Sequence, residues 1–265
     1  MKSRTQLSWM QFTVRGILLL TAILGVVVAT CGNYWHKRWR AENRIAHLGG
    51  SIGKPSVSLE GTNANDDDLI SLANLIHLTN LSDTSVLSLN LADTRITDNG
   101  LRYLSKLDNL WILSLRGTRV TDEGLVHLTG LSNLDELVLD DTNITGQGLQ
   151  HLSRLPSLST LRLQGTAIDD GSLAKLHQLS SLEMVMLAGT PITDAGLEHL
   201  QTLDGLEAIF LHDSGSGVPQ NVPLGVTDNG IADLQRSLPN CHVHGDRGWR
   251  RVSKTKLPAV VRSVD

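Results

Sequence analysis

The chain has 265 residues, of which 40% are hydrophobic, 19% charged and 3% aromatic. A chain of this length can bury a sizeable core, and so few aromatic residues require that core to be aliphatic. Residues 1–54 contain eight Lys or Arg and one acidic residue, a net charge of +7. Residues 55–244 contain nine Lys or Arg and 24 acidic residues (−15), and residues 245–265 contain six Lys or Arg and two acidic residues (+4). The acidic centre argues against a nucleic-acid-binding body, which needs a basic face. Two cysteines, Cys31 and Cys241, cannot form a disulfide framework.

Residues 16–35 are 20 consecutive residues without Asp, Glu, Lys or Arg. Twenty residues in a helix rise about 30 Å, the thickness of a bilayer core. Aromatic residues lie before this stretch and around its C-terminal end, as in an interfacial belt: Trp9, Phe12, Tyr34, Trp35 and Trp39. The sequence therefore predicts a short basic N-terminal segment (1–15), a transmembrane helix (16–35) and a basic connector (36–54) that contacts membrane lipid.

Two alternatives stay open for this apolar stretch. It could be a cleaved secretory signal, although no clear A-x-A site follows it, or a lipoprotein signal at Cys31. For a retained helix, three basic residues precede it and four follow it, which leans weakly toward a cytoplasmic C-terminal side. We expect a single-pass membrane protein, and this narrow count leaves the side of its main domain open.

Residues 55–244 repeat with a period of 24 residues. The unit reads L-x-L-x-x-T-x-I-T-D-x-G-L-x-x-L-x-x-L-x-x-L-x-x. Five copies begin at Leu89, Leu113, Leu137, Leu161 and Val185. A sixth copy from Ile209 carries an insert at 213–225, and a degenerate copy from Val57 precedes them all. About seven copies at a fixed period predict a solenoid.

Each unit predicts a strand, a turn and a helix. The L-x-L segment is a short strand with inward leucines, and the Thr after it is placed to bond the backbone of the neighbouring coil. The T-D pair supplies N-cap oxygens, and leucines spaced three apart fall on one helical face. We expect residues 53–81 to cap one end and residues 238–244 to form a last strand. Residues 245–265 read as a basic, disordered tail.

This pattern resembles the leucine-rich repeat, in the L-T-x-I-T-D-x-G-L variety of ribonuclease-inhibitor-like and F-box-associated repeats. Residues 10–245 resemble bacterial membrane-anchored leucine-rich-repeat proteins, including an L-G-G-type segment at residues 47–52. The resemblance implies an α/β solenoid, a horseshoe with a parallel sheet on its concave face and helices on its convex face, preceded by one transmembrane helix. It also implies protein binding, without a particular chemistry.

Side chains next to the inward strand leucines are expected to face outward on the concave face and to bind a partner protein. The candidate binding residues are Ser114, Arg116, Val138, Asp140, Arg162, Gln164, Met184, Met186, Phe210 and His212. The middle of this set is charged, whereas Met184, Met186 and Phe210 form an apolar end. Two interpretations of that end stay open: an exposed contact patch, or a patch that the insert 213–225 covers.

The sequence contains no H-E-x-x-H or C-x-x-C motif. His212, His242 and His244 could meet at one rim and suit zinc, but no ligand-spacing motif supports this. We therefore predict no catalytic activity, no cofactor and no metal, an unknown protein ligand, and no nucleic acid. A substrate adaptor for protein turnover and a secreted or lipid-anchored ligand-binding protein remain as alternatives.

Overall fold

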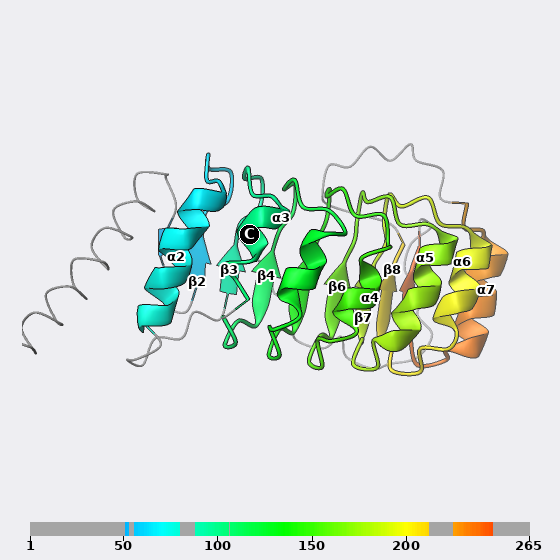
Figure 1. The fold of residues 1–265 in the computed structure, drawn as a ribbon. Coiled ribbons are helices and arrows are strands. Elements are labelled where there is room, and N and C mark those ends of the chain that lie inside the picture. The colour runs from blue at the N-terminus through cyan, green and yellow to red at the C-terminus, as the bar shows by residue number, and fades with distance from the viewer. Residues whose placement is uncertain (1–50, 53–55, 80–87, 106, 212–224, 246–265) are drawn as a thin grey trace, which may run out of the picture.

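The computed structural model describes residues 51–52, 56–79, 88–105, 107–211 and 225–245. These residues form one sheet of nine strands in chain order, β1 to β9, covered on one side by short helices (Figure 1). Strand β1 pairs antiparallel with β2, and β2 to β9 are all parallel. The predicted α/β solenoid with a parallel sheet and alternating helices is therefore confirmed.

The strands are β1 (Ser51–Ile52), β2 (Ser56–Ser58), β3 (Ser88–Asn90), β4 (Ile112–Ser114), β5 (Glu136–Val138), β6 (Thr160–Arg162), β7 (Met184–Met186), β8 (Ala208–Phe210) and β9 (His242–His244). The helices are α2 (Asp66–Thr79), α3 (Asp98–Leu101), η1 (Gly124–Leu128), α4 (Leu149–Leu152), α5 (Asp170–Leu173), η2 (Ala174–Gln178), α6 (Asp194–Leu200) and α7 (Asp228–Ser237), with η marking 3-10 helices. No described helix is both long and apolar enough to cross a membrane. The predicted transmembrane helix, the connector and residues 246–265 lie outside the described residues, as does most of the insert.

The register of the parallel strands reproduces the period of the sequence. Leu89 pairs with Leu113, Leu113 with Leu137 and Leu137 with Leu161, each 24 residues apart. These central strand residues have no exposed surface, because alternate side chains of a strand point to opposite sides of the sheet. They belong to a single aliphatic core that extends from Val57 to Cys241.

The helices are shorter than the sequence predicted, since several of them have only four or five residues. The cause is the spacing of three between leucines, which matches a 3-10 turn better than an α-helix. Leu104 N–H donates to the Leu101 carbonyl (2.9 Å), Leu107 N–H to Leu104 (2.9 Å) and Leu110 N–H to Leu107 (3.0 Å). This run of tight turns carries the chain back to the next strand.

The buried threonines bond a different backbone group from the one predicted. Thr118 Oγ1 donates to the carbonyl of Leu115 in its own coil (2.6 Å), and Thr142 does the same to Leu139 (2.6 Å). The predicted bond to the neighbouring coil is wrong, because the hydroxyl on the fourth residue of a turn lies closest to the carbonyl of the first. The threonine therefore closes a turn and does not join two coils.

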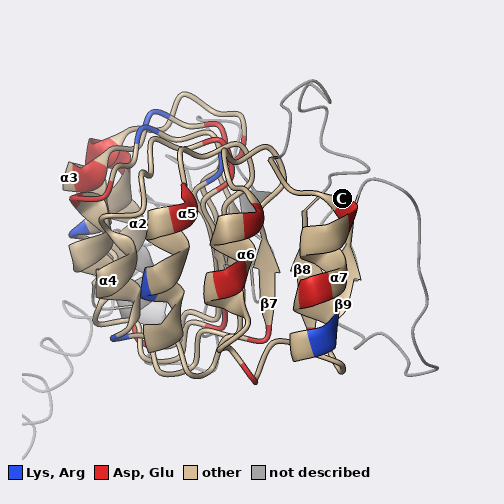
Figure 2. Ribbon diagram, turned by 90° about the vertical axis from the view of Figure 1, so that its right-hand side faces the viewer, with Lys and Arg blue, Asp and Glu red and all other residues tan. Residues whose placement is uncertain are grey.

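Successive coils are joined instead by the aspartate of the T-D pair. Asp98, in the first turn of α3, accepts hydrogen bonds from the backbone N–H (2.8 Å) and hydroxyl (2.7 Å) of Thr121 in the next coil. The same two bonds join Asp66 to Thr97, Asp122 to Thr145, Asp170 to Thr193 and Asp194 to Thr227. Acidic residues accordingly recur on α3, α5 and α6 (Figure 2). As predicted, Thr97 and Thr193 also cap their helices, by accepting a backbone N–H.

The glycine of the motif leaves room for that carboxylate. A Cβ added to Gly124 would lie 2.2 Å from Asp98 Oδ1, and one added to Gly196 would lie 2.3 Å from Asp170 Oδ1. Real Cβ atoms essentially never approach so closely, and the aspartate cannot move aside without losing its bonds to threonine. The T-D pair of one coil therefore requires glycine in the next coil.

One link in the series is built differently. Gly146 stands where the other coils have the linking aspartate, and Ser172 stands where the next coil would have glycine. Ser172 Oγ donates to the Thr145 carbonyl (3.0 Å), and Lys175 Nζ donates to the Gly146 carbonyl (3.1 Å). The Ser172 side chain, from the next coil, thus takes the place of the missing carboxylate. The two departures from the motif, Gly146 for aspartate and Ser172 for glycine, compensate each other.

We predict that Gly196→Ala lowers the free energy of unfolding by about 1–3 kcal/mol, because the added methyl group overpacks the site of Asp170. Gly171→Ala is the control: it lies in helix α5, and its nearest neighbouring atom would be 3.8 Å away. The control should leave stability unchanged or raise it by up to about 1 kcal/mol. Denaturant unfolding of both variants checks this, and equal effects would contradict the packing argument.

Candidate interaction surface on the sheet

The sheet face turned away from the helices carries the side chains next to the buried central strand residues. The third residue of each strand pairs across the parallel sheet and forms one row: Ser58, Asn90, Ser114, Val138, Arg162, Met186, Phe210 and His244. This row, called the third-residue row below, changes from polar at β2 to aromatic at β9. Because the strands fix its spacing, it presents different side chains on one rigid frame.

The predicted binding residues fall into two groups by exposure. Ser114, Arg116, Arg162, Met186 and Phe210 are partly exposed. Val138, Asp140, Gln164 and Met184 are buried, and His212 lies outside the described residues. The expected apolar patch thus keeps Met186 and Phe210 at its surface, while Met184 is covered.

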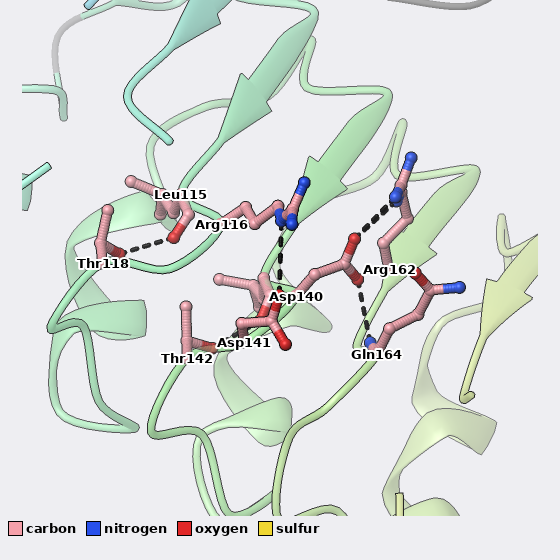
Figure 3. A network of polar contacts seen from close by, with 9 residues as sticks. Leu115, Arg116, Thr118, Asp140, Asp141, Thr142, Arg162 and Gln164 are labelled. Atoms are coloured by element: carbon pink, nitrogen blue, oxygen red, sulfur yellow. Dashed lines mark hydrogen bonds and ion pairs between the residues drawn. The ribbon is translucent and has the colours of Figure 1, made fainter. Parts of the chain in front are cut away.

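Asp140 is buried because the next coil covers it (Figure 3). Its Oδ2 accepts from Arg162 Nε (2.9 Å) and lies 2.7 Å from Arg162 Nη2, and its Oδ1 accepts from the backbone N–H of Gln164 (2.9 Å). The Asp140 side chain is 3% exposed and that of Arg162 is 31% exposed. A buried carboxylate therefore fixes a guanidinium group whose outer part faces solvent. The alternation of inward and outward residues in the sequence could not reveal this burial, because the covering side chain, Arg162, comes from the next strand.

Arg116 forms a second and weaker ion pair on the same face. Its Nε lies 3.3 Å from Asp141 Oδ2, and both side chains are 38% exposed. Such pairs contribute about 0–1 kcal/mol, so this one leaves Arg116 available for other contacts. Asp141 has a φ of 55°, in the left-handed region that favours glycine. The corresponding residue of the next coil is Gly165, where an added Cβ would lie 2.4 Å from Asp141 Oδ1.

Burial changes the pKa values of two acids on this face. Desolvation raises the pKa of Asp140 from its ordinary value of 3.8, although Arg162 acts in the opposite direction. Desolvation also raises the pKa of Glu136, again opposed by Arg162. The positive charge of Arg162 is thus shared between two partly desolvated carboxyl groups, which gives the middle of the sheet face a charged and polar character.

The row ends in an aromatic pair that the sequence prediction did not include. The rings of Phe210 and His244 stack with centroids 4.3 Å apart and an angle of 4° between their planes. Met186 precedes Phe210 in the third-residue row. Burial lowers the pKa of His244, with the charge of His242 as a second cause. The sequence does place His244 and Phe210 at the same position of successive repeats. The insert between them breaks the 24-residue spacing, so this correspondence is hard to recognise.

The described residues contain no group of three or more His, Cys, Asp or Glu placed to hold a metal ion. Of the three histidines considered for zinc, His242 and His244 lie on β9, and His212 is outside this part of the chain. Cys241 is buried in the core, and burial raises the pKa of its thiol to about 12. No catalytic site is evident among the described residues.

Comparison with known proteins agrees with this architecture. The family described as "Leucine Rich repeat" matches residues 82–105. The fold is similar to that of an internalin, inlF, from Listeria monocytogenes, with a TM-score of 0.50, 21% identity, and coverage of 73% of this chain and 54% of that one. This chain thus spans about half the length of that internalin. At this identity the likeness shows the fold alone.

Two further solved structures are similar over somewhat shorter parts of this chain. A leucine-rich-repeat protein of Leptospira interrogans has a TM-score of 0.45 and 19% identity, covering 67% of this chain and 39% of that one. Internalin C2 of Listeria monocytogenes has a TM-score of 0.42 and 24% identity, covering 65% and 78%. No curated protein matches the chain.

We predict that Asp140→Asn changes the pH dependence of stability. Because the folded state raises the pKa of Asp140, this residue favours folding below its ordinary pKa of 3.8, and the contribution is lost as the pH rises through the raised pKa. The variant lacks this titration. Its free energy of unfolding relative to the wild-type protein should therefore increase from acidic to neutral pH. Denaturant unfolding across this range checks the slope, and a difference that falls with pH would contradict the prediction.

Proposed function

We propose that this chain, a leucine-rich-repeat protein, binds another protein through the exposed residues of its sheet face and is held at a membrane by residues 16–35. The observation that carries the binding proposal is the fixed guanidinium group of Arg162. Asp140 holds it from below, and 31% of the side chain remains exposed. Arg116, Met186 and Phe210 lie on the same face and complete a mixed polar and apolar contact surface.

A fixed arginine binds a partner at low entropic cost. Immobilising a flexible side chain at an interface costs about 0.5–1.5 kcal/mol, and Asp140 has already restrained this one. Arginine and aromatic residues also contribute most often to the energy of protein interfaces. Eight parallel strands spaced about 4.8 Å apart make a sheet about 34 Å wide, which is sufficient for a partner patch of standard size.

The binding role needs no chemistry from this chain. Leucine-rich-repeat domains typically bind proteins, and we propose that this one acts as a scaffold without catalytic activity. The unit L-x-L-x-x-T-x-I-T-D-x-G-L supports assigning the repeats to the ribonuclease-inhibitor-like or F-box-type variety. In this account the constant period of 24 residues supplies the frame, and the exposed positions between the leucines supply specificity.

Support for the membrane tether comes from the sequence of residues 1–54. Twenty residues without a formal charge are followed by a connector rich in Lys and Arg, which favours contact with anionic headgroups. We propose a single-pass protein, with a weak preference for a cytoplasmic repeat domain. The chain should stay in the membrane pellet after alkaline carbonate extraction, and deletion of residues 16–35 should release it. Recovery of a shortened soluble chain would instead indicate a cleaved signal.

We predict that Phe210→Ala and Arg116→Ala each weaken binding of the cognate partner by about tenfold, or about 1.4 kcal/mol. The partner is first identified by cross-linking in cells, and affinities are then measured with purified proteins. Val126→Ala is the control, because Val126 is an exposed residue of the helix layer, on the other side of the molecule from the sheet face. Arg162→Ala is less suitable, since it leaves Asp140 buried without its counter-ion.

Loss of binding in the Val126 variant, with unchanged affinity in the two sheet-face variants, would contradict this proposal. It would place the contact on the helices. Thermal unfolding of each variant confirms that a change in affinity does not reflect loss of the fold.

A further inference from the structure

The aromatic end of the third-residue row lies beside the point where the described chain ends. Met186, Phe210 and His244 occupy consecutive strands and are each partly exposed, and we call these three residues the shelf. Strand β9 is the last strand of the sheet in the described residues, so the shelf reaches the sheet's edge. The shelf consists of a thioether and two rings that stack on each other, and a further aromatic side chain can pack against this group.

Acidic residues flank this shelf at the N-terminal ends of its strands. Glu183 directly precedes β7 and Glu207 directly precedes β8, and both are exposed. The surface that complements this arrangement has an aromatic side chain next to positive charges.

The chain's own C-terminal sequence has this composition. Beyond Gly245 it continues Asp-Arg-Gly-Trp-Arg-Arg, and residues 246–265 contain six Lys or Arg and two acids. Trp249 is five residues from His244, so an extended chain carries it up to about 17 Å. Met186 is two strands from β9, a distance of about 10 Å. Trp249 can therefore reach every part of the shelf.

We propose that residues 246–265 bind the sheet face of their own chain. Trp249 packs on the shelf, and Arg250 and Arg251 lie near Glu183 and Glu207. Tethering makes this favourable even for weak contacts, since a short flexible link corresponds to an effective concentration on the order of millimolar. The docked segment covers part of the surface that a partner would use. That last consequence rests on the proposed function, whereas docking itself does not.

The four methionines of the chain allow a direct test. Two of them, Met1 and Met10, are in the N-terminal segment, so the methyl signals of Met184 and Met186 report on the sheet face without crowding. We would label the methionine methyl groups with ¹³C in the full chain, in a zwitterionic detergent, and record their NMR spectra. The same spectra are recorded for Trp249→Ala and for a chain that ends at Gly245.

Docking predicts that both changes move the Met186 methyl signal downfield by similar amounts, because each removes the indole ring above it. Arg250→Glu with Arg251→Glu should move it in the same direction, and salt should reduce the difference between full and shortened chains. Trp111→Ala is the matched control. Trp111 is 55% exposed and directly precedes β4, three strands from β7, so its loss should leave Met186 unchanged.

An identical Met186 signal in the full chain and the chain ending at Gly245 would overturn the proposal. The same holds if replacing residues 213–224 by a Gly/Ser linker shifts Met186 while truncation does not, since the insert would then cover the shelf. If the tail binds only lipid, truncation would leave the Met186 signal unchanged both with and without anionic lipid, which also overturns the proposal. None of these outcomes depends on whether the protein has an external partner.

Discussion

The stacking of this solenoid depends on a carboxylate that joins each coil to the next. Asp98 and its counterparts accept both a backbone N–H and a hydroxyl from the threonine one coil later. Hydrogen bonds to a charged acceptor are stronger than neutral ones, and these are partly shielded from water. The link also dictates the glycine that follows, because no Cβ fits beside the carboxylate. The threonine, aspartate and glycine of the motif thus depend on one another.

Fixed coils allow the opposite side of the molecule to vary. Because the register of β2 to β9 is constant, the third-residue row can change from serine to arginine to phenylalanine without altering the backbone. Asp140 repeats the linking principle on this side, since its carboxylate bonds the Gln164 backbone and orients Arg162. One buried acid therefore supports both the fold and the proposed contact surface, and the contacts that fix the arginine offset only part of its desolvation.

The sequence was sufficient for the period, the inward leucines and the strand register, because these follow from repetition and alternation. It did not predict the hydrogen-bond partner of the buried threonine. Carbonyl groups of two coils lie near the hydroxyl, and the choice between them depends on side-chain geometry that a sequence pattern does not specify. It overestimated the helices because a leucine spacing of three fits two kinds of helix. The burial of Asp140 by Arg162 and the stacking of Phe210 on His244 involve residues in different coils, 22 and 34 positions apart, and no local pattern encodes them.

Native-state hydrogen exchange of the linking threonines tests the central claim most directly. The amides of Thr121 and Thr193 donate to the preceding coil's aspartate, so they should exchange only when the whole domain unfolds. Their protection should then equal that of the Leu115 amide, which lies in the sheet ladder and bonds Val138. Exchange of the threonine amides at the much faster rates of solvent-exposed turns would show that the coils are not held together by these links.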